Sequence, residues 1–149
     1  SITFYGSNQE RKLENLNQVI ITNGMTDIIS FHDGVFGKEK EAVLLDADIF
    51  LMTSRFEGHP TGLLEALAYG LPCLVTTGSN MRNEVETENA GWGADNDAES
   101  IGAAILKMIS EKLSYKRKGE NAYNLSLKYD WDTLAKKAHD SYKKMINFL

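Results

Sequence analysis

Short apolar runs alternate with amphipathic helical stretches along this chain, and this alternation is the feature that most constrains its fold. Four runs are typical of strands, at about 2–5, 28–31, 48–52 and 73–76, and Gly91–Gly93 is typical of a short strand or turn. Apolar residues recur at helical spacing over about 9–21, 38–46, 61–69, 98–111, 115–127 and 131–149. The pattern predicts an α/β fold: a Rossmann-like, three-layer α/β/α arrangement with a parallel sheet and right-handed crossovers.

Length and composition fit one soluble domain covering residues 1–149. Apolar residues make up 42% of the chain, and 16 basic against 21 acidic residues give a net charge of −5, which argues against a nucleic-acid partner. The single cysteine, Cys73, excludes an internal disulfide, and no Cys/His spacing indicates zinc. No apolar run reaches the roughly 20 residues of a membrane helix, and no signal peptide is evident. We therefore expect a cytoplasmic protein without a transmembrane segment.

The helix predicted over 61–69 has the clearest boundaries. Pro60 precedes it, Gly70 follows it, and Pro72 prevents its continuation. It comes directly after the apolar strand at 48–52, and ligands of such sheets bind beyond the carboxyl ends of the strands. The loops expected to carry function are therefore 6–9, 32–39, 53–61 and 77–82.

Two glutamates flank the start of this helix. Glu65 lies among Leu and Ala residues on a helix that we expect to be buried, where a carboxylate needs hydrogen-bond donors such as ligand hydroxyls. Glu57 lies in the preceding loop, and the helix N-terminus between them favours an anion, commonly a phosphate. Gly58 and Gly62 allow the backbone to approach a ligand closely. A nucleotide sugar, with hydroxyls at both ends and a diphosphate between, matches this layout.

Each residue alone has a simpler interpretation. Glu57 is consistent with a solvated loop carboxylate, and Glu65 with an ion pair to Arg55 or Arg82. His59 alone is more typical of a surface or packing histidine than of a catalyst. Only the whole segment, in its order and context, is specific.

That segment resembles the donor-binding motif of the retaining GT-B glycosyltransferases known as group 1 or family 4. The family motif has two glutamates separated by seven residues, as Glu57 and Glu65 are, within 54–58 and 64–72. Weaker similarities follow in the family's order at 2–6, 46–48, 76–80, 90–93 and 129–131. The resemblance implies a fold of two Rossmann-like domains with the donor between them. This chain would be the C-terminal half, without its first strand–helix unit and without that unit's Arg and Lys.

The resemblance also implies a role for each residue of the segment. Glu57 would be catalytic and contact the transferred sugar, and Glu65 would bind the ribose hydroxyls of the donor. Phe36, in the loop at 35–37, would lie against the nucleobase. Backbone amides would hold the sugar and the diphosphate, around Gly58, His59, Thr61, Gly62, Leu63 and Leu64. Pro60 is a departure, because it has no N–H where many relatives have a glycine amide.

The implied activity is retaining, metal-independent transfer of a sugar to a glycan or lipid-linked acceptor in polysaccharide or cell-envelope synthesis. No cofactor or metal is implied, because the nucleotide sugar, such as a UDP- or GDP-sugar, is a substrate. The acceptor would bind the N-terminal domain, so the isolated chain is expected to be inactive. The full enzyme could sit peripherally at the inner face of the membrane. The alternatives are a non-catalytic nucleotide-sugar-binding module and a GT-B-shaped nucleotide-sugar epimerase.

Overall fold

A computed structural model describes residues 1–6 and 12–146 of the chain. The chain divides into two compact units, 1–43 and 44–149, and each is described by itself. The helix cap predicted at Asn8 lies outside the described residues.

The first unit is a strand–helix–strand crossover. Strands β1 (Ile2–Tyr5) and β2 (Ile29–His32) pair in parallel, in a register that runs from Ile2 opposite Ile29. Helix α1 (Lys12–Thr22) connects them and ends just before Gly24, whose φ of +64° suits a left-handed turn. Helix α2 (Gly37–Asp46) begins in this unit and ends in the second. The parallel pairing confirms the predicted crossover.

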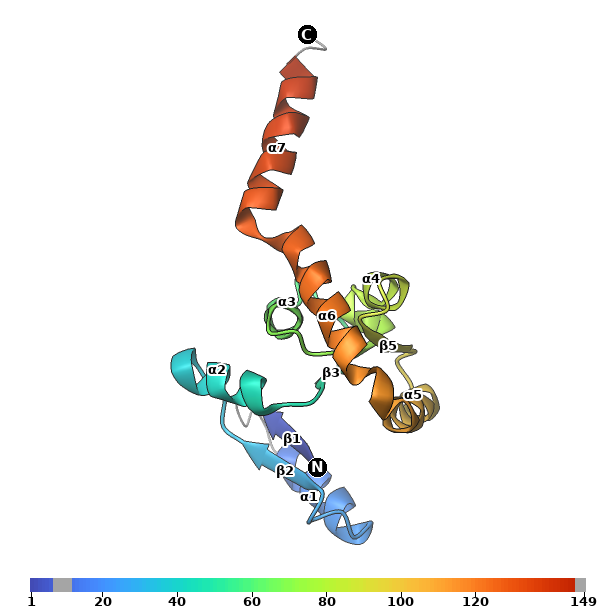
Figure 1. The fold of residues 1–149 in the computed structure, drawn as a ribbon. Coiled ribbons are helices and arrows are strands. Elements are labelled where there is room, and N and C mark those ends of the chain that lie inside the picture. The colour runs from blue at the N-terminus through green and yellow to red at the C-terminus, as the bar shows by residue number, and fades with distance from the viewer. Residues whose placement is uncertain (7–11, 147–149) are drawn as a thin grey trace. The chain divides into compact units, whose positions relative to one another are not determined.

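The second unit is built on a three-stranded parallel sheet in the order β3-β4-β5. Figure 1 labels β3 and β5 together with the helices of this unit. The strands are β3 (Phe50–Met52), β4 (Cys73–Thr76) and β5 (Gly91–Ala94). The helices are α3 (Thr61–Ala68), α4 (Arg82–Thr87), α5 (Ala98–Ser110), α6 (Tyr115–Ser126) and α7 (Trp131–Ile146). Short 3-10 helices cover Thr77–Ser79, Lys112–Ser114 and Leu127–Tyr129.

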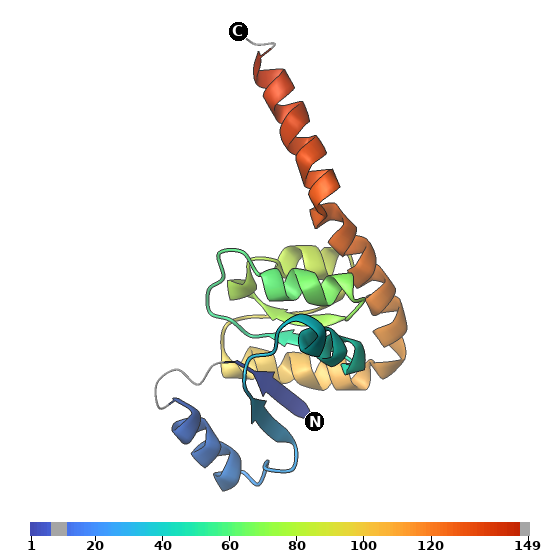
Figure 2. The same ribbon diagram turned by 90° about the vertical axis from the view of Figure 1, so that its left-hand side faces the viewer.

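Strand β4 is the centre of this unit and is buried along its whole length. Its alternate residues join two different hydrophobic clusters. Cys73 and Val75 pack with side chains of α3, α4 and α6, whereas Leu74 packs with Trp92 and with side chains of α5. Figure 2 shows α3 and α4 on one side of the sheet and α5 on the other. This arrangement confirms the predicted three-layer α/β/α architecture.

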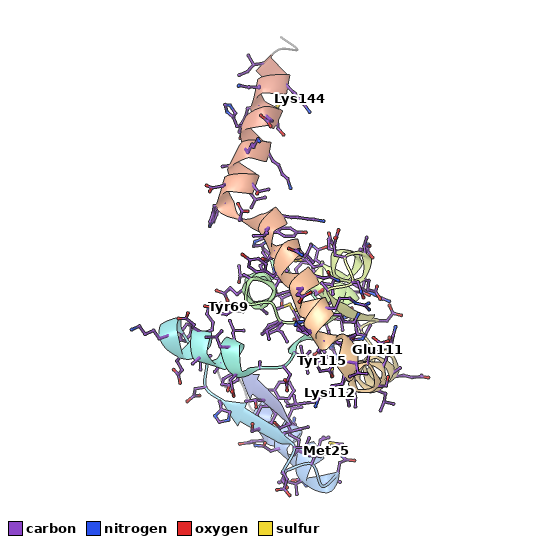
Figure 3. The ribbon with its side chains drawn as sticks, in the orientation of Figure 1. Met25, Tyr69, Glu111, Lys112, Tyr115 and Lys144 are labelled. Atoms are coloured by element: carbon purple, nitrogen blue, oxygen red, sulfur yellow. The ribbon has the colours of Figure 1, made fainter. Side chains whose placement is uncertain are left out.

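Trp92 of β5 ties the sheet to α5 and α6. Its Nε1 donates to Glu111 Oε2 over 2.9 Å, and its ring meets that of Tyr115 edge-on, with centroids 5.6 Å apart. Figure 3 shows Glu111 and Tyr115 at the junction of α5 and α6. The buried Lys118 Nζ lies 4.8 Å from the centre of the same ring and donates to the Gly91 carbonyl. These contacts hold α5 and α6 against β5. They do not involve the loops that follow the carboxyl ends of the strands.

Three features differ from the sequence expectations. Helix α4 was not predicted, because six residues are too few for a hydrophobic period to show. Helix α3 is not buried all round: Leu63, Ala66 and Leu67 face the core, but Ala68 and Tyr69 are exposed. Helix α7 has no buried residue, so its apolar stripe covers no core in this structure, and 147–149 lie outside the described part. Within that part, no helix has the length and apolarity needed to cross a membrane.

Candidate functional site

Three loops meet at the carboxyl edge of the second unit's sheet. They follow β3 at 53–60, β4 at 77–81 and β5 at 95–97. Parallel strands in register end at one edge, so loops from different strands come together there. The Glu57 N–H donates to the Gly78 carbonyl over 2.8 Å, and Asn96 bonds both other loops. These three loops are therefore joined to one another by hydrogen bonds.

Glu57 is held at its side chain and at its backbone. The carboxylate is half-buried and accepts a hydrogen bond from Ser54 Oγ over 2.6 Å. The Ser54 carbonyl in turn accepts from the buried Thr76 Oγ1 over 2.7 Å. Glu57 is therefore held in place rather than freely solvated, and its role toward a sugar stays a prediction.

The N-terminus of α3 follows directly after this carboxylate. Pro60 occupies the N-cap position, and no side chain in the described part of the chain caps the helix. The Thr61 amide donates to the His59 carbonyl and the Leu64 amide to the Pro60 carbonyl. The first N–H groups of a helix have no acceptor within the helix. The amides of Gly62 and Leu63 are such groups, and they can donate to an acceptor from outside. Together with the dipole, they make this turn suitable for an anion.

The glycines of the segment are not required by packing within the unit. A Cβ added at Gly58 would meet no atom of the described residues within 4 Å. At Gly62 it would lie 3.8 Å from the Phe50 ring, an ordinary van der Waals distance. His59, next to Gly58, is exposed. Small residues that the core does not demand are consistent with space kept for a ligand.

Glu65 lies in the second turn of α3, with seven residues between it and Glu57. It is half-buried rather than buried as expected, because α3 packs on the sheet through a different face. Arg82, one of the two cations considered as its partner, is engaged by Asp95 and by Glu86, 3.0 Å away. The hydrogen bond from Arg82 to Asp95 is the main cause that raises the pKa of Arg82.

Phe36 belongs to the first unit, in the loop before α2, and its side chain is 79% exposed. Its role against a nucleobase stays a prediction. The other predicted residues, from Glu57 to Glu65, all lie in the second unit, on one loop and one helix.

Sequence reasoning missed the residues that support the Glu57 loop. Ser54, Thr76 and Asn96 each bond this loop or its neighbour. Gly78 packs so closely against the Glu57 loop that an added Cβ would lie 2.4 Å from the Arg55 backbone. The turn-forming Thr77–Asn80 run was a signal for a loop here, but nothing in the sequence pointed to Asn96.

Comparison with known families shows to which family this chain belongs. The family model described as "Glycosyl transferases group 1" matches residues 2–125. The chain belongs to the group 1 glycosyltransferases. Among curated relatives, the putative colanic acid biosynthesis glycosyltransferase WcaL of Salmonella typhimurium is 34% identical over 105 residues, covering 66% of this chain and 25% of the relative. A UDP-Gal:alpha-D-GlcNAc-diphosphoundecaprenol alpha-1,3-galactosyltransferase of Escherichia coli is 28% identical over 111 residues, covering 70% of this chain and 27% of the relative.

Solved structures agree with this group 1 assignment at the level of the fold. WaaG, a glycosyltransferase involved in lipopolysaccharide biosynthesis, matches with a TM-score of 0.73 and 24% identity, over 93% of this chain and 36% of that one. The sucrose-phosphate synthase of Thermosynechococcus elongatus matches with a TM-score of 0.74 and 18% identity, over 99% of this chain and 38% of that one. The fold is thus that of GT-B glycosyltransferases, and the chain spans about a quarter of the length of the curated relatives it matches.

Proposed function

We propose that this chain is the donor-binding part of an enzyme that transfers a sugar from a nucleotide-sugar donor to a glycan or lipid-linked acceptor. The observation that carries the proposal is the held carboxylate of Glu57 beside the uncapped N-terminus of α3, with Glu65 one turn further along that helix. The family assignment supports the class of reaction. Relatives of this chain include a galactosyltransferase and a mannosyltransferase, which supports a hexosyl donor.

In this proposal the donor diphosphate lies at the first turn of α3. The Gly62 and Leu63 amides and the helix dipole stabilise the negative charge that develops on the leaving diphosphate. The proposal assigns no metal to this task. Glu65 accepts from the ribose hydroxyls, and Glu57 contacts the transferred sugar. Transfer proceeds with retention at the anomeric carbon.

The test uses the full-length enzyme and a thermal-shift screen against UDP-, GDP- and ADP-sugars. A donor that binds the folded state raises the melting temperature. At a donor concentration one hundred times its Kd, the folded state gains about 2.7 kcal/mol of stability. Glu65→Ala is expected to weaken nucleoside diphosphate binding about tenfold, because the ribose loses its acceptor. Glu57→Ala is expected to lower turnover more than it lowers nucleoside diphosphate affinity. The proposal would be overturned if no donor shifted the melting temperature and no donor was turned over.

A further inference from the structure

Glu57 lies in an eight-residue loop between β3 and α3, so neither a helix nor a strand fixes the position of its backbone. A carboxylate that contacts a reacting sugar must be placed within a fraction of an ångström to be effective. The groups that hold this loop are therefore of functional interest, although none of them touches the donor in the proposed function.

Asn96 bridges the two loops that meet at Glu57. Its Nδ2 donates to the Ser54 carbonyl over 2.7 Å, and its Oδ1 accepts from the Gly78 amide over 2.8 Å. The same two loops are joined a second time, because the Glu57 N–H donates to the Gly78 carbonyl over 2.8 Å. The Asn96 amide thus closes a ring of hydrogen bonds around the base of the Glu57 loop.

The chemistry of this bridge selects asparagine. One end of the side chain must donate and the other must accept, and only an amide of this length does both. Aspartate would keep the acceptor for Gly78 but would place a negative oxygen against the Ser54 carbonyl. Gly78 has a matching constraint: a side chain there would collide with the Ser54 and Arg55 backbone, whose nearest atoms lie 2.4 Å from the added Cβ. The backbones of the two loops are therefore in direct contact, and the Asn96 amide joins them by two hydrogen bonds.

The bridge reaches the carboxylate through Ser54. Ser54 offers its carbonyl to Asn96 and to Thr76 Oγ1, while its hydroxyl donates to Glu57 Oε1. A shift of the Ser54 backbone would therefore move the hydroxyl that orients the carboxylate. We propose that Asn96 is a positioning residue that holds Glu57 in place for sugar transfer through Ser54 and Gly78. This inference rests on the proposed function, and it concerns a residue that lies on a different strand–loop unit from the glutamate motif.

The experiment is a double-mutant cycle in the full-length enzyme, with nucleoside diphosphate release from the best donor of the thermal screen as the assay. Asn96→Ala is expected to lower kcat about tenfold, with the Kd for the nucleoside diphosphate changed less than twofold. Asn96→Asp keeps the acceptor for the Gly78 amide but repels the Ser54 carbonyl, so it is expected to lower kcat at least as much as Asn96→Ala. In a Glu57→Gln background, Asn96→Ala should cost little more, because the group that it positions is already gone.

The control is Asn124→Ala. Asn124 is exposed on α6 and lines a groove with Ala47 and Pro72, which precede β3 and β4 at the opposite end of the sheet. It should leave kcat and Kd unchanged. Multiplicative losses in the Glu57→Gln background, or equal losses in kcat and nucleotide affinity, would show that Asn96 acts only on general stability and would overturn the inference.

Amide hydrogen exchange separates this inference from the proposed function, because it needs no donor. Asn96→Ala and Asn96→Asp should both speed exchange at the Glu57 amide, and Asn96→Ala should also speed it at the Gly78 amide. Unchanged exchange at both amides would overturn the bridge even in an active enzyme. Faster exchange in a protein that binds no nucleotide sugar would keep the bridge and reject the donor-binding function.

Discussion

At the scale of single residues, the strictest demand in the fold falls on Gly91 of β5. A Cβ at this position would lie 1.8 Å from the carbonyl oxygen of Cys73 on the neighbouring strand, far inside van der Waals contact. The residue is buried, and its own carbonyl accepts from Lys118 Nζ. The three nearest atoms to the added Cβ all belong to the Cys73 backbone, which cannot move aside as the far end of a flexible side chain could. Glycine here is therefore set by the close approach of two backbones, not by a turn.

Gly91→Ala is accordingly expected to lower the free energy of unfolding by at least about 3 kcal/mol, because it forces β4 and β5 apart. Gly102→Ala is the matched control. Gly102 lies inside α5, and an added Cβ there meets nothing within 4 Å among the described residues. That change should raise stability by about 0.5–1 kcal/mol, through helix propensity alone. Urea denaturation measures both, and equal effects at the two glycines would contradict the assigned contact.

At the scale of elements, α7 depends on its cap more than the other helices do. It has no buried residue, so tertiary packing does not support it in this structure. Asp130 caps it: the carboxylate accepts from the Thr133 N–H over 2.7 Å and from the Thr133 hydroxyl over 2.9 Å. The backbone bond, followed by the hydroxyl bond, lowers the pKa of Asp130 below its ordinary value of 3.8.

The start of α7 should therefore respond to acid. A carboxylate whose pKa is lowered on folding stabilises the folded form above its ordinary pKa, and that contribution is lost as the pH falls through the lowered value. Carbon chemical shifts of residues 131–134 should move toward coil values between about pH 4 and pH 2. In Asp130→Asn the cap is kept without a titrating group, so this pH response should disappear. A response of the same size in that variant would assign it to another residue.

Elements with clear boundary residues or a sustained apolar pattern were predictable from the sequence, whereas the six-residue helix α4 was not. The start of α3 at Thr61 follows from Pro60, and its end near Gly70 from the glycine's φ of +71°. Strand β4 matches its prediction residue for residue, since a strand covered on both faces is apolar throughout. The half-burial of Glu65 was not predictable, because composition shows that a helix is apolar but not which face meets the sheet.

At the scale of the whole molecule, the site combines a motif that is local in sequence with a support that is not. Glu57 and Glu65 are near neighbours in the chain, so one segment was enough to predict them together. Asn96 lies 42 positions from Ser54, its bonding partner. Nothing in the alternation of strands and helices states which polar side chain of one loop will reach another. The topology predicted which edge carries the site, and the hydrogen bonds across that edge required the structure.

The single cysteine offers a probe of how the second unit opens. Cys73 is fully buried in the central strand, and burial raises the pKa of its thiol, so the folded protein keeps it protonated and covered. A disulfide reagent such as Ellman's should therefore react only when the sheet opens, because the thiolate is the nucleophile. At neutral pH the reaction should be slow in buffer and should become fast above the urea midpoint.

An internal standard makes this measurement decisive. Leu113, in the short 3-10 helix between α5 and α6, is fully exposed. A Leu113→Cys variant should therefore give two phases of equal amplitude, one immediate from residue 113 and one slow from Cys73. A ligand that binds the folded unit should slow the second phase and leave the first unchanged, since linkage stabilises only the closed state. Two fast phases in native buffer would show that β4 is accessible without unfolding, and that the central strand is not the stable centre of this unit.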